Sequence, residues 1–147
     1  MSSEQQSLSD QSQTPDSEAT SAQPCVLLVE DDRSVRRYLE VTLQRSGYTV
    51  ATAADGLEAM KLALSAPIDV VVTDAVMPNL GGLELARFLR SNPKLAHIPI
   101  VLLTGQENKD AVAGEKLIDV FLYKPVRAEE LKNCLTSLLS SGPVARD

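Results

Sequence analysis

The chain has 147 residues, a length typical of a single globular domain, and 44% of them are hydrophobic. Its net charge of −6 argues against nonspecific binding to nucleic acid, and a content of 3% aromatic residues without tryptophan argues against base stacking. No apolar run approaches the roughly 20 residues that span a bilayer, and the polar N-terminus fits neither a secretory signal nor a transit peptide. We therefore expect a cytoplasmic protein without membrane insertion or direct binding of nucleic acid.

The cysteines and the histidine give no indication of a zinc site or a disulfide framework. Cys25 and Cys134 lie far apart in the sequence without a CxxC pair, and His97 is the only histidine. We expect both cysteines to be ordinary buried thiols, because free cysteine is usually buried.

The N-terminal segment, residues 1–24, differs in composition from the rest of the chain. It contains seven serines, five glutamines and four acidic residues, and neither lysine nor arginine. Such a segment cannot bury enough apolar surface to offset the entropy that is lost on ordering, so we expect a disordered tail. A folded domain is expected over 25–141, with a short C-terminal tail over 142–147.

From residue 25 onwards, short apolar runs alternate with helical patterns. The first run, "CVLLVE" (25–30), is predicted to be a strand that ends in acidic residues. A helix is predicted over 33–47, where Gly47 marks its end. The residues at helical spacing in it are Val35, Tyr38, Leu39, Thr42 and Leu43.

The same alternation continues to the end of the predicted domain. Further strands are predicted over 48–53, 68–73, 98–103 and 119–123. The helices that follow them are predicted over 56–67, 82–93, 107–116 and 128–139. The helix over 56–67 places Leu57, Met60 and Leu64 on one apolar face. The last helix has an apolar stripe that consists of Leu131, Cys134, Leu135, Leu138 and Leu139.

This order of elements predicts an α/β fold. Strands that alternate with helices form a parallel sheet through right-handed crossovers, with helices on both faces. A β-branched run such as "IDVVVT" (68–73) is typical of a strand that is covered on both faces. We expect a doubly wound, five-stranded, flavodoxin-like (βα)5 sheet with the strand order 2-1-3-4-5.

Charged and hydroxyl side chains collect where the predicted strands end, which is the edge at which open α/β sheets bind ligands. In chain order they are Glu30, Asp31, Asp32, Asp74, Thr104 and Lys124, with Asp55 set further from its strand. Neighbouring carboxylates repel by about 1 kcal/mol per pair in water and about 4 kcal/mol near a protein surface, and a hard cation such as Mg²⁺ relieves this repulsion. A lysine and a hydroxyl beside the cation make a pocket for a phosphoryl group, with Asp74 as the nucleophile.

Each of these residues also has a purely structural interpretation. Asp32 is expected to cap the helix that begins at Arg33. Taken singly, Lys124 fits a solvated loop lysine and Thr104 a local hydrogen bond. Their complementary chemistry at one edge of one sheet favours the phosphoryl site instead.

Four motifs carry a resemblance to a known family. "VLLVEDD", "VVVTDAVMPNLGGLEL", "VLLTG" and "FLYKP" resemble the signatures of the receiver domain of two-component response regulators, in particular the chemotaxis-regulator type. The resemblance covers residues 25–141. The D-x-x-MP and KP motifs are specific as a set, although each is weak alone.

The resemblance implies a role for each acidic position. Asp74 matches the phosphoacceptor, which takes its phosphoryl group from a phosphohistidine on a sensor histidine kinase or a histidine phosphotransfer protein. Asp31 matches the direct ligand of Mg²⁺, and Glu30 matches the acid that acts through water. The backbone carbonyl of Val76 is implied as a further metal ligand, so Mg²⁺ is the expected cofactor.

The resemblance also implies a switch. Lys124 would pair with the phosphoryl oxygens, and Thr104 would move to hydrogen-bond one of them. Phe121 holds the aromatic position that turns inward as Thr104 moves, so the surface offered to a downstream protein target changes. Val76 and Gln106 match positions that tune dephosphorylation.

The sequence departs from the family pattern at several places. Gly81 replaces an acid that many members have, and Phe121 replaces the commoner tyrosine. The stretch between Thr104 and Lys124 is shorter than usual, and "KLID" (116–119) replaces a glycine before the fifth strand. These changes affect the surface that engages a target and leave the chemistry of the site intact.

Several functions are compatible with this pattern. We expect a stand-alone receiver that signals by protein contact or passes phosphate along a relay, without enzymatic turnover beyond its own phosphorylation and slow dephosphorylation. The alternatives are a receiver excised from a larger regulator or hybrid kinase, and a degenerate receiver that serves as a binding module. A haloacid-dehalogenase-like phosphatase would need a second acid where this chain has Val76.

Overall fold

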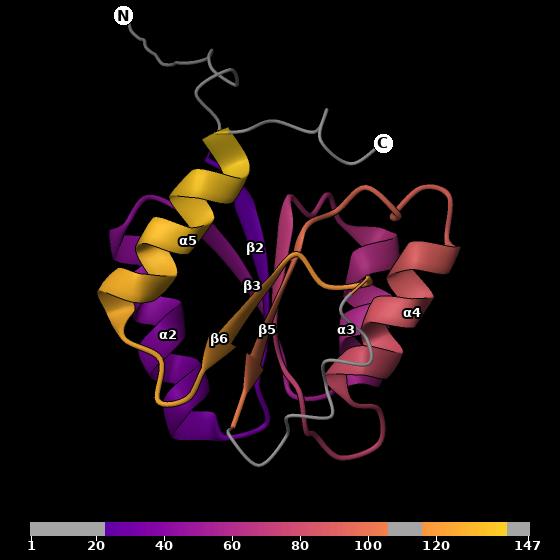
Figure 1. The fold of residues 1–147 in the computed structure, drawn as a ribbon, viewed down its shortest axis with the longest axis horizontal. Helices are drawn as coiled ribbons and strands as arrows, with labels where there is room; N and C mark the ends of the chain where they lie inside the picture. The colour runs from indigo at the N-terminus through magenta and orange to yellow at the C-terminus, as the bar shows by residue number, and fades with distance from the viewer. Residues whose placement is uncertain (1–22, 106–115, 141–147) are drawn as a thin grey trace, which may run out of the picture.

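The computed structural model describes residues 23–105 and 116–140, in which five parallel strands form one sheet (Figure 1). The strands are β2 (Cys25–Val29), β3 (Thr49–Ala53), β4 (Val70–Asp74), β5 (Ile100–Thr104) and β6 (Val120–Tyr123). The helices are α2 (Arg33–Arg45), α3 (Gly56–Ser65), α4 (Gly82–Ser91) and α5 (Ala128–Ser140). The order across the sheet is β3-β2-β4-β5-β6, which confirms the predicted flavodoxin-like arrangement.

Some predictions fall on residues outside these ranges. The helix predicted over 107–116 lies almost entirely outside the described residues, and so do the two predicted tails apart from Gln23 and Pro24. Both tails and that helix stay predictions.

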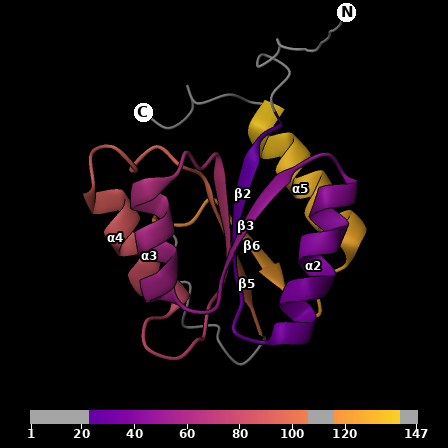
Figure 2. The same cartoon turned by 180° about the vertical axis from the view of Figure 1, so that it is seen from behind.

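The helices cover both faces of the sheet, so the structure has three layers (Figures 1 and 2). Because side chains alternate between the faces of a strand, each central strand contributes to two cores. On one face, α2 and α5 pack Leu39, Leu43, Leu131 and Leu135 against the sheet. On the other face, α3 and α4 cover a core with Ala59, Ala63, Leu85, Ala86 and Leu89. The central strands β4 and β5 are buried along their whole length, as a doubly covered sheet requires.

The ends of α2 follow the sequence signals. Asp32 is the N-cap, and its carboxylate accepts a hydrogen bond from the Val35 amide at 3.0 Å. Gly47 follows the helix with a φ of 100°, a left-handed conformation that glycine adopts without strain.

The apolar face predicted for α3 is only partly correct. Met60 is half-buried and packs against the core, but Leu57 and Leu64 are 48% and 61% exposed. The fully buried residues of the helix are Gly56, Ala59 and Ala63. Small residues let the helix approach its neighbours closely: a Cβ added at Gly56 would stand 2.6 Å from the carbonyl oxygen of Leu80. The apolar periodicity favoured the larger residues for the buried face, but the close approach of the helix to its neighbours leaves room there mainly for the smaller ones.

Two smaller expectations also change. Cys25 and Cys134 are free thiols, but both are half-buried instead of fully buried. In α2, only Leu39 and Leu43 of the apolar set are buried, while Val35 and Tyr38 stay exposed.

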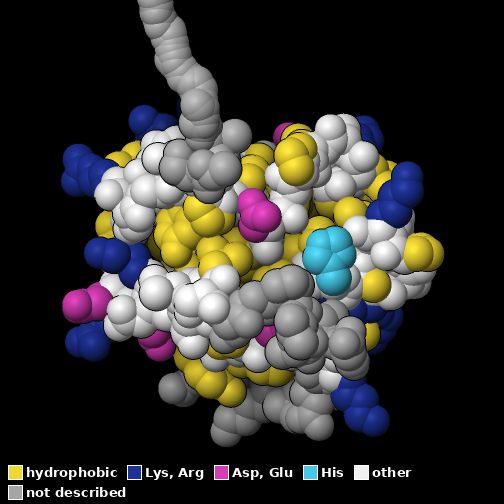
Figure 3. Space-filling model, turned by 90° about the horizontal axis from the view of Figure 1, so that it is seen from above, with side chains coloured by type: hydrophobic (Ala, Val, Ile, Leu, Met, Phe, Trp, Pro, Cys, Tyr) yellow, Lys and Arg dark blue, Asp and Glu magenta, His cyan; other side chains and the backbone are white. Residues whose placement is uncertain are grey.

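The two ends of the sheet differ in the distribution of charge. Figure 3 views the end at which the strands begin, where acidic side chains are scattered singly among apolar and basic ones. The strands end at the opposite side of the molecule. Among the described residues, no helix is long and apolar enough to cross a membrane.

Candidate functional site

The strand register brings the polar residues of the sequence motifs together at the carboxyl edge of the sheet. Val29 at the end of β2 pairs with Thr73, so Glu30 follows beside Asp74. In the next strands of the sheet, Thr104 at the end of β5 pairs with Tyr123 at the end of β6, and Lys124 follows directly. Residues from four segments thus meet at one edge.

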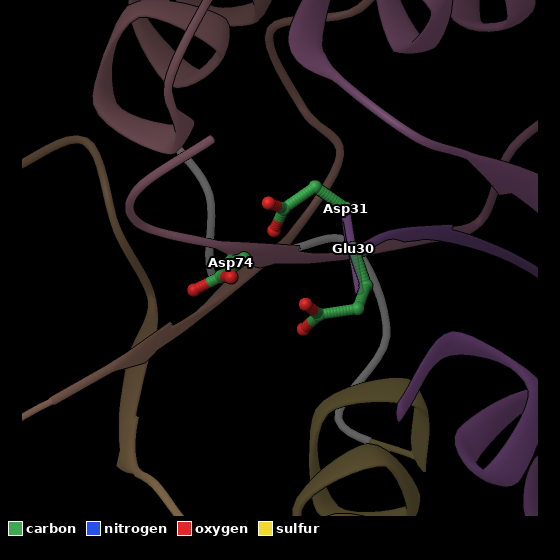
Figure 4. Close-up of side chains that lie close together, drawn as sticks. All are labelled: Glu30, Asp31 and Asp74. Atoms are coloured by element: carbon green, nitrogen blue, oxygen red, sulfur yellow. The ribbon is translucent and has the colours of Figure 1, made fainter. Parts of the chain in front are cut away.

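Three carboxylates form the centre of the site. Glu30, Asp31 and Asp74 each offer an oxygen that lies within 4.8 Å of the others. Figure 4 shows the three side chains gathered around a common space, two of them from the end of β2 and one from the end of β4. Glu30 and Asp74 are buried, whereas Asp31 is exposed.

Lys124 balances part of this negative charge. Its ammonium donates a hydrogen bond to the Asp74 carboxylate at 2.8 Å and lies 3.5 Å from Oε1 of Glu30. Burial disfavours the charged form of Lys124, but the contacts with Asp74 and Glu30 outweigh this effect and raise its pKa. Lys124 therefore stays a cation at neutral pH. The peptide bond to Pro125 that follows it is cis.

Glu30 is the most unusual group of the site. Its side chain is 1% exposed, and Oε2 accepts a hydrogen bond from the Asp32 amide at 3.0 Å. Among the described residues, none donates a hydrogen bond to the buried Oε1, although Lys124 is within ion-pair distance of it. The pKa of Glu30 is raised to about 7, mainly by burial and in part by the charge of Asp74, whereas the hydrogen bond from the Asp32 amide lowers it.

The donor set fits a hard divalent cation. Carboxylate oxygens in a group of three are the ligands that Mg²⁺ prefers, together with carbonyl oxygens and waters. In the described part of the chain, the buried Oε1 of Glu30 has no hydrogen-bond donor. A cation beside the cluster would offset the repulsion between the three carboxylates. Among the described residues, none donates a hydrogen bond to the carbonyl of Val76, so that oxygen is also free to bind.

Among the described residues, the hydroxyl of Thr104 makes no hydrogen bond to the carboxylate cluster. Thr104 is 2% exposed, and its hydroxyl donates to the carbonyl of Gly105 at 3.2 Å. Phe121 is half-buried and packs against the core on the α3–α4 side of the sheet. Val76 is 62% exposed, and Gln106 lies outside the described residues. Their roles stay predictions.

A pocket of about 1120 Å³ gives access to the site. Asp74 and Lys124 both line it, so the ion pair at the strand ends faces an open space. The walls come from α2 and from the segment after β6, and they include Ser34, Val35, Tyr38, Leu39, Pro125 and Val126. A phosphodonor could therefore approach Asp74, although the residue itself is only 6% exposed.

Comparison with known proteins identifies the family. The sequence model of the response regulator receiver domain matches residues 26–136. The chain belongs to the response regulator receiver domain family. This family assignment makes it a signalling domain of a two-component system.

Similar proteins agree with this assignment. The transcriptional regulatory protein AfsQ1 of Streptomyces coelicolor is 37% identical over 121 residues, which are 81% of this chain and 52% of AfsQ1. The response regulator MprA of Mycobacterium ulcerans is 41% identical over 116 residues, which are 78% of this chain and 49% of MprA. The receiver domain thus spans about half the length of these curated relatives.

Solved structures of receiver domains share the fold. The chemotaxis response regulator CheY4 of Vibrio cholerae is 34% identical with a TM-score of 0.72, over 79% of this chain and 98% of CheY4. The response regulator TrrA of Thermotoga maritima, solved in complex with Mg²⁺–BeF, is 32% identical with a TM-score of 0.71, over 78% of this chain and 98% of TrrA.

Sequence reasoning missed several contacts that shape this receiver site. The guanidinium of Arg36 donates to the carbonyl of Glu30 at 2.8 Å, and Asn79 donates to Asp55 at 2.8 Å. A Cβ at Gly82 would collide with the carbonyl oxygen of Asp74. The "NLGG" turn signalled an unusual loop, but no sequence signal identified the partners of these residues.

Proposed function

We propose that this receiver domain accepts a phosphoryl group on Asp74 from a phosphohistidine of a sensor histidine kinase or a histidine phosphotransfer protein. The observation that carries the proposal is the 2.8 Å contact between Lys124 and Asp74, next to two further carboxylates within 4.8 Å. A nucleophilic carboxylate, a fixed cation and a cluster of hard oxygen ligands are the groups that phosphoryl transfer requires.

The chemistry is a displacement at phosphorus. An oxygen of Asp74 attacks the phosphoryl group, the bond between phosphorus and the imidazole nitrogen breaks, and the imidazole leaves with the bonding electron pair. The product is an acyl phosphate on Asp74 and a neutral histidine on the donor after protonation. Lys124, which lies 2.8 Å from Asp74, would then pair with the phosphoryl oxygens.

Mg²⁺ is the proposed cofactor, held by Asp31, Asp74, the Val76 carbonyl and, through water, Glu30. When it is bound, it neutralises charge on the phosphoryl oxygens. Among the described residues, the buried Oε1 of Glu30 has no hydrogen-bond donor, and a water that Mg²⁺ retains would supply one. The complex of TrrA with Mg²⁺ and beryllofluoride, a species that resembles a phosphoryl group, supports this assignment by similarity.

The proposed output is a change of the surface that partners contact. Thr104 would leave its present contact with the Gly105 carbonyl and turn to the phosphoryl group, and Phe121 would fill the space that it vacates. Phosphorylation of Asp74 would thus shift the equilibrium between two conformations, and a downstream protein target would bind one of them more tightly. Val76 and Gln106 are the residues proposed to tune the lifetime of the acyl phosphate.

The test is phosphorylation by a small donor. The full chain is incubated with acetyl phosphate and Mg²⁺, and intact mass is followed by mass spectrometry. We expect one phosphoryl group per chain, stable in acid and labile in base, and no adduct after chelation. Asp74→Asn should abolish labelling. Asp69→Asn, which changes an exposed aspartate where β4 begins, is the matched control and should label normally.

The outcomes separate the alternatives. Labelling that persists in Asp74→Asn would move the acceptor to another residue. Failure of the wild type to label with acetyl phosphate and with histidine kinases would favour a receiver that acts as a binding module without phosphorylation.

A further inference from the structure

The loop between β4 and α4 is attached to the start of α3 by two hydrogen bonds. The Asn79 side-chain amide donates to Oδ2 of Asp55 at 2.8 Å, and the Gly56 amide donates to the carbonyl of Leu80 at 3.1 Å. The partners come from segments more than twenty residues apart, since Asn79 and Asp55 are separated by 24 positions. Neither side chain belongs to the carboxylate cluster or to the switch.

Asp55 is held in place independently of Asn79. As the N-cap of α3, Asp55 accepts a hydrogen bond from the Glu58 amide on its Oδ1 at 2.9 Å. The Glu58 side chain accepts from the amide of Ala54, the residue before the N-cap, at 2.7 Å. These two hydrogen bonds fix the orientation of the Asp55 carboxylate. The hydrogen bonds from Glu58 and then from Asn79 lower the pKa of Asp55. Asp55 is thus an oriented anion that offers Oδ2 to the loop, and hydrogen bonds to an anion are stronger than neutral ones.

Asn79 has a backbone conformation that few residues tolerate. Its φ is 72°, in the left-handed region, where asparagine is among the few residues other than glycine that occur regularly. The chain reverses here, and Leu80 turns its carbonyl to Gly56. The side-chain bond to Asp55 therefore holds the loop at its point of reversal.

The other end of the loop is attached to the sheet. The Ala75 amide donates to the Leu103 carbonyl at 2.8 Å, and the Gly82 amide closes the loop on the Ala75 carbonyl at 2.9 Å. Val76 lies between the two attachments, and it is 62% exposed. The path of the backbone at Val76 thus depends on both ends of the loop.

We propose that Asp55 and Asn79 are positioning residues for the metal site: their hydrogen bond fixes the loop that carries the Val76 carbonyl, and so sets the affinity for Mg²⁺. The inference rests on the proposed function, because it assumes that this carbonyl is a metal ligand. Residues that orient metal ligands change metal affinity by about 10- to 100-fold when they are replaced. Because this pair lies near the surface, we expect an effect of about tenfold, at the lower end of that range.

The test measures Mg²⁺ affinity by calorimetric titration of the full chain. Asn79→Gly keeps the left-handed backbone and loses the donor, and Asn79→Asp sets two carboxylates against each other. Each should raise the dissociation constant for Mg²⁺ about tenfold. The double variant, Asp55→Asn with Asn79→Asp, exchanges donor and acceptor at unchanged net charge and should recover most of the affinity, because asparagine also caps helices.

Controls separate positioning from loss of stability. Asn92→Asp changes an asparagine that accepts the Lys94 amide at the far end of α4, and Leu95→Ala weakens the core in the same region. Both should leave Mg²⁺ affinity unchanged, provided that urea titration shows each variant fully folded. The added negative charge in Asn79→Asp attracts Mg²⁺, so the expected loss runs against simple electrostatics.

The outcomes are distinguishable from failure of the proposed function. If the wild type binds no Mg²⁺ and does not label on Asp74, the proposed function fails. If the wild type binds Mg²⁺ and both Asn79 variants bind it equally well, the positioning role is overturned. The same conclusion follows if the folded double variant binds no better than Asn79→Asp alone.

Discussion

The buried carboxyl group of Glu30 should make the stability of the metal-free protein depend on pH. The side chain is 1% exposed, and burial is the main cause that raises its pKa from 4.5 to about 7. When it ionises, the folded protein must keep a charge where water is excluded, whereas the unfolded chain hydrates it. In the presence of a chelator, the free energy of unfolding should therefore fall as the pH rises, and Glu30→Gln should remove this component.

The magnitude follows from the difference in pKa between the two states. Between pH 4.5 and about 7, the folded protein holds a proton on Glu30 that the unfolded chain has released, so the free energy of unfolding decreases with pH. At about 1.4 kcal/mol per pKa unit, the full difference corresponds to about 3 kcal/mol. The destabilisation is absent well below pH 4.5 and complete above pH 7.

Urea titrations followed by circular dichroism between pH 5 and pH 8 measure this effect. The difference in free energy of unfolding between wild type and Glu30→Gln should change by about 2 to 3 kcal/mol across that range. Glu129→Gln, which alters an exposed carboxylate on α5, is the matched control and should follow the wild-type profile. Parallel profiles for wild type and Glu30→Gln would refute the reasoning, because they would mean that folding does not perturb this group.

Further predictions concern the lysine of the site and the packing around it. Lys124→Met leaves the buried carboxylates without their cation, so it should raise the pKa of Glu30 further and destabilise the protein by about 2 kcal/mol at pH 8, measured in the same urea series. Gly82→Ala places a methyl group against the backbone at the end of β4 and should lower the free energy of unfolding by about 1 to 3 kcal/mol. Leu135→Ala, at a fully buried position of α5, should lower it by about 2 to 5 kcal/mol, whereas Leu64→Ala, 61% exposed, should change it by less than about 1 kcal/mol in the same assay.

Local sequence patterns were sufficient to predict the strands, most of the helices and the order of these elements along the chain. Runs such as "IDVVVT" have the length and β-branched composition of a buried strand, and helical spacing indicated α2, α3 and α5. Because parallel strands all end at the same edge of a sheet, the sequence alone predicted that Glu30, Asp31 and Asp74 lie close together, as they do in the structure. The helix at α3 was predicted, but part of its buried face was not. The periodicity favoured Leu57 and Leu64, whereas the close approach of α3 to its neighbours decided which residues lie inward.

Distances between segments were decided by the tertiary structure alone. Lys124 and Asp74 are 50 positions apart, and only the paired strands bring the ammonium to within 2.8 Å of the carboxylate. The local pattern does not tell which of the adjacent acids is buried, and the structure buries Glu30 and exposes Asp31.

The sequence by itself determined which chemical groups this receiver domain carries and on which strand ends they stand, because periodicity and composition act over neighbouring residues. The tertiary structure decided which of these groups lose water and which meet, including the bond between Asn79 and Asp55. Burial and contact depend on how closely distant segments pack, and no local pattern encodes that spacing.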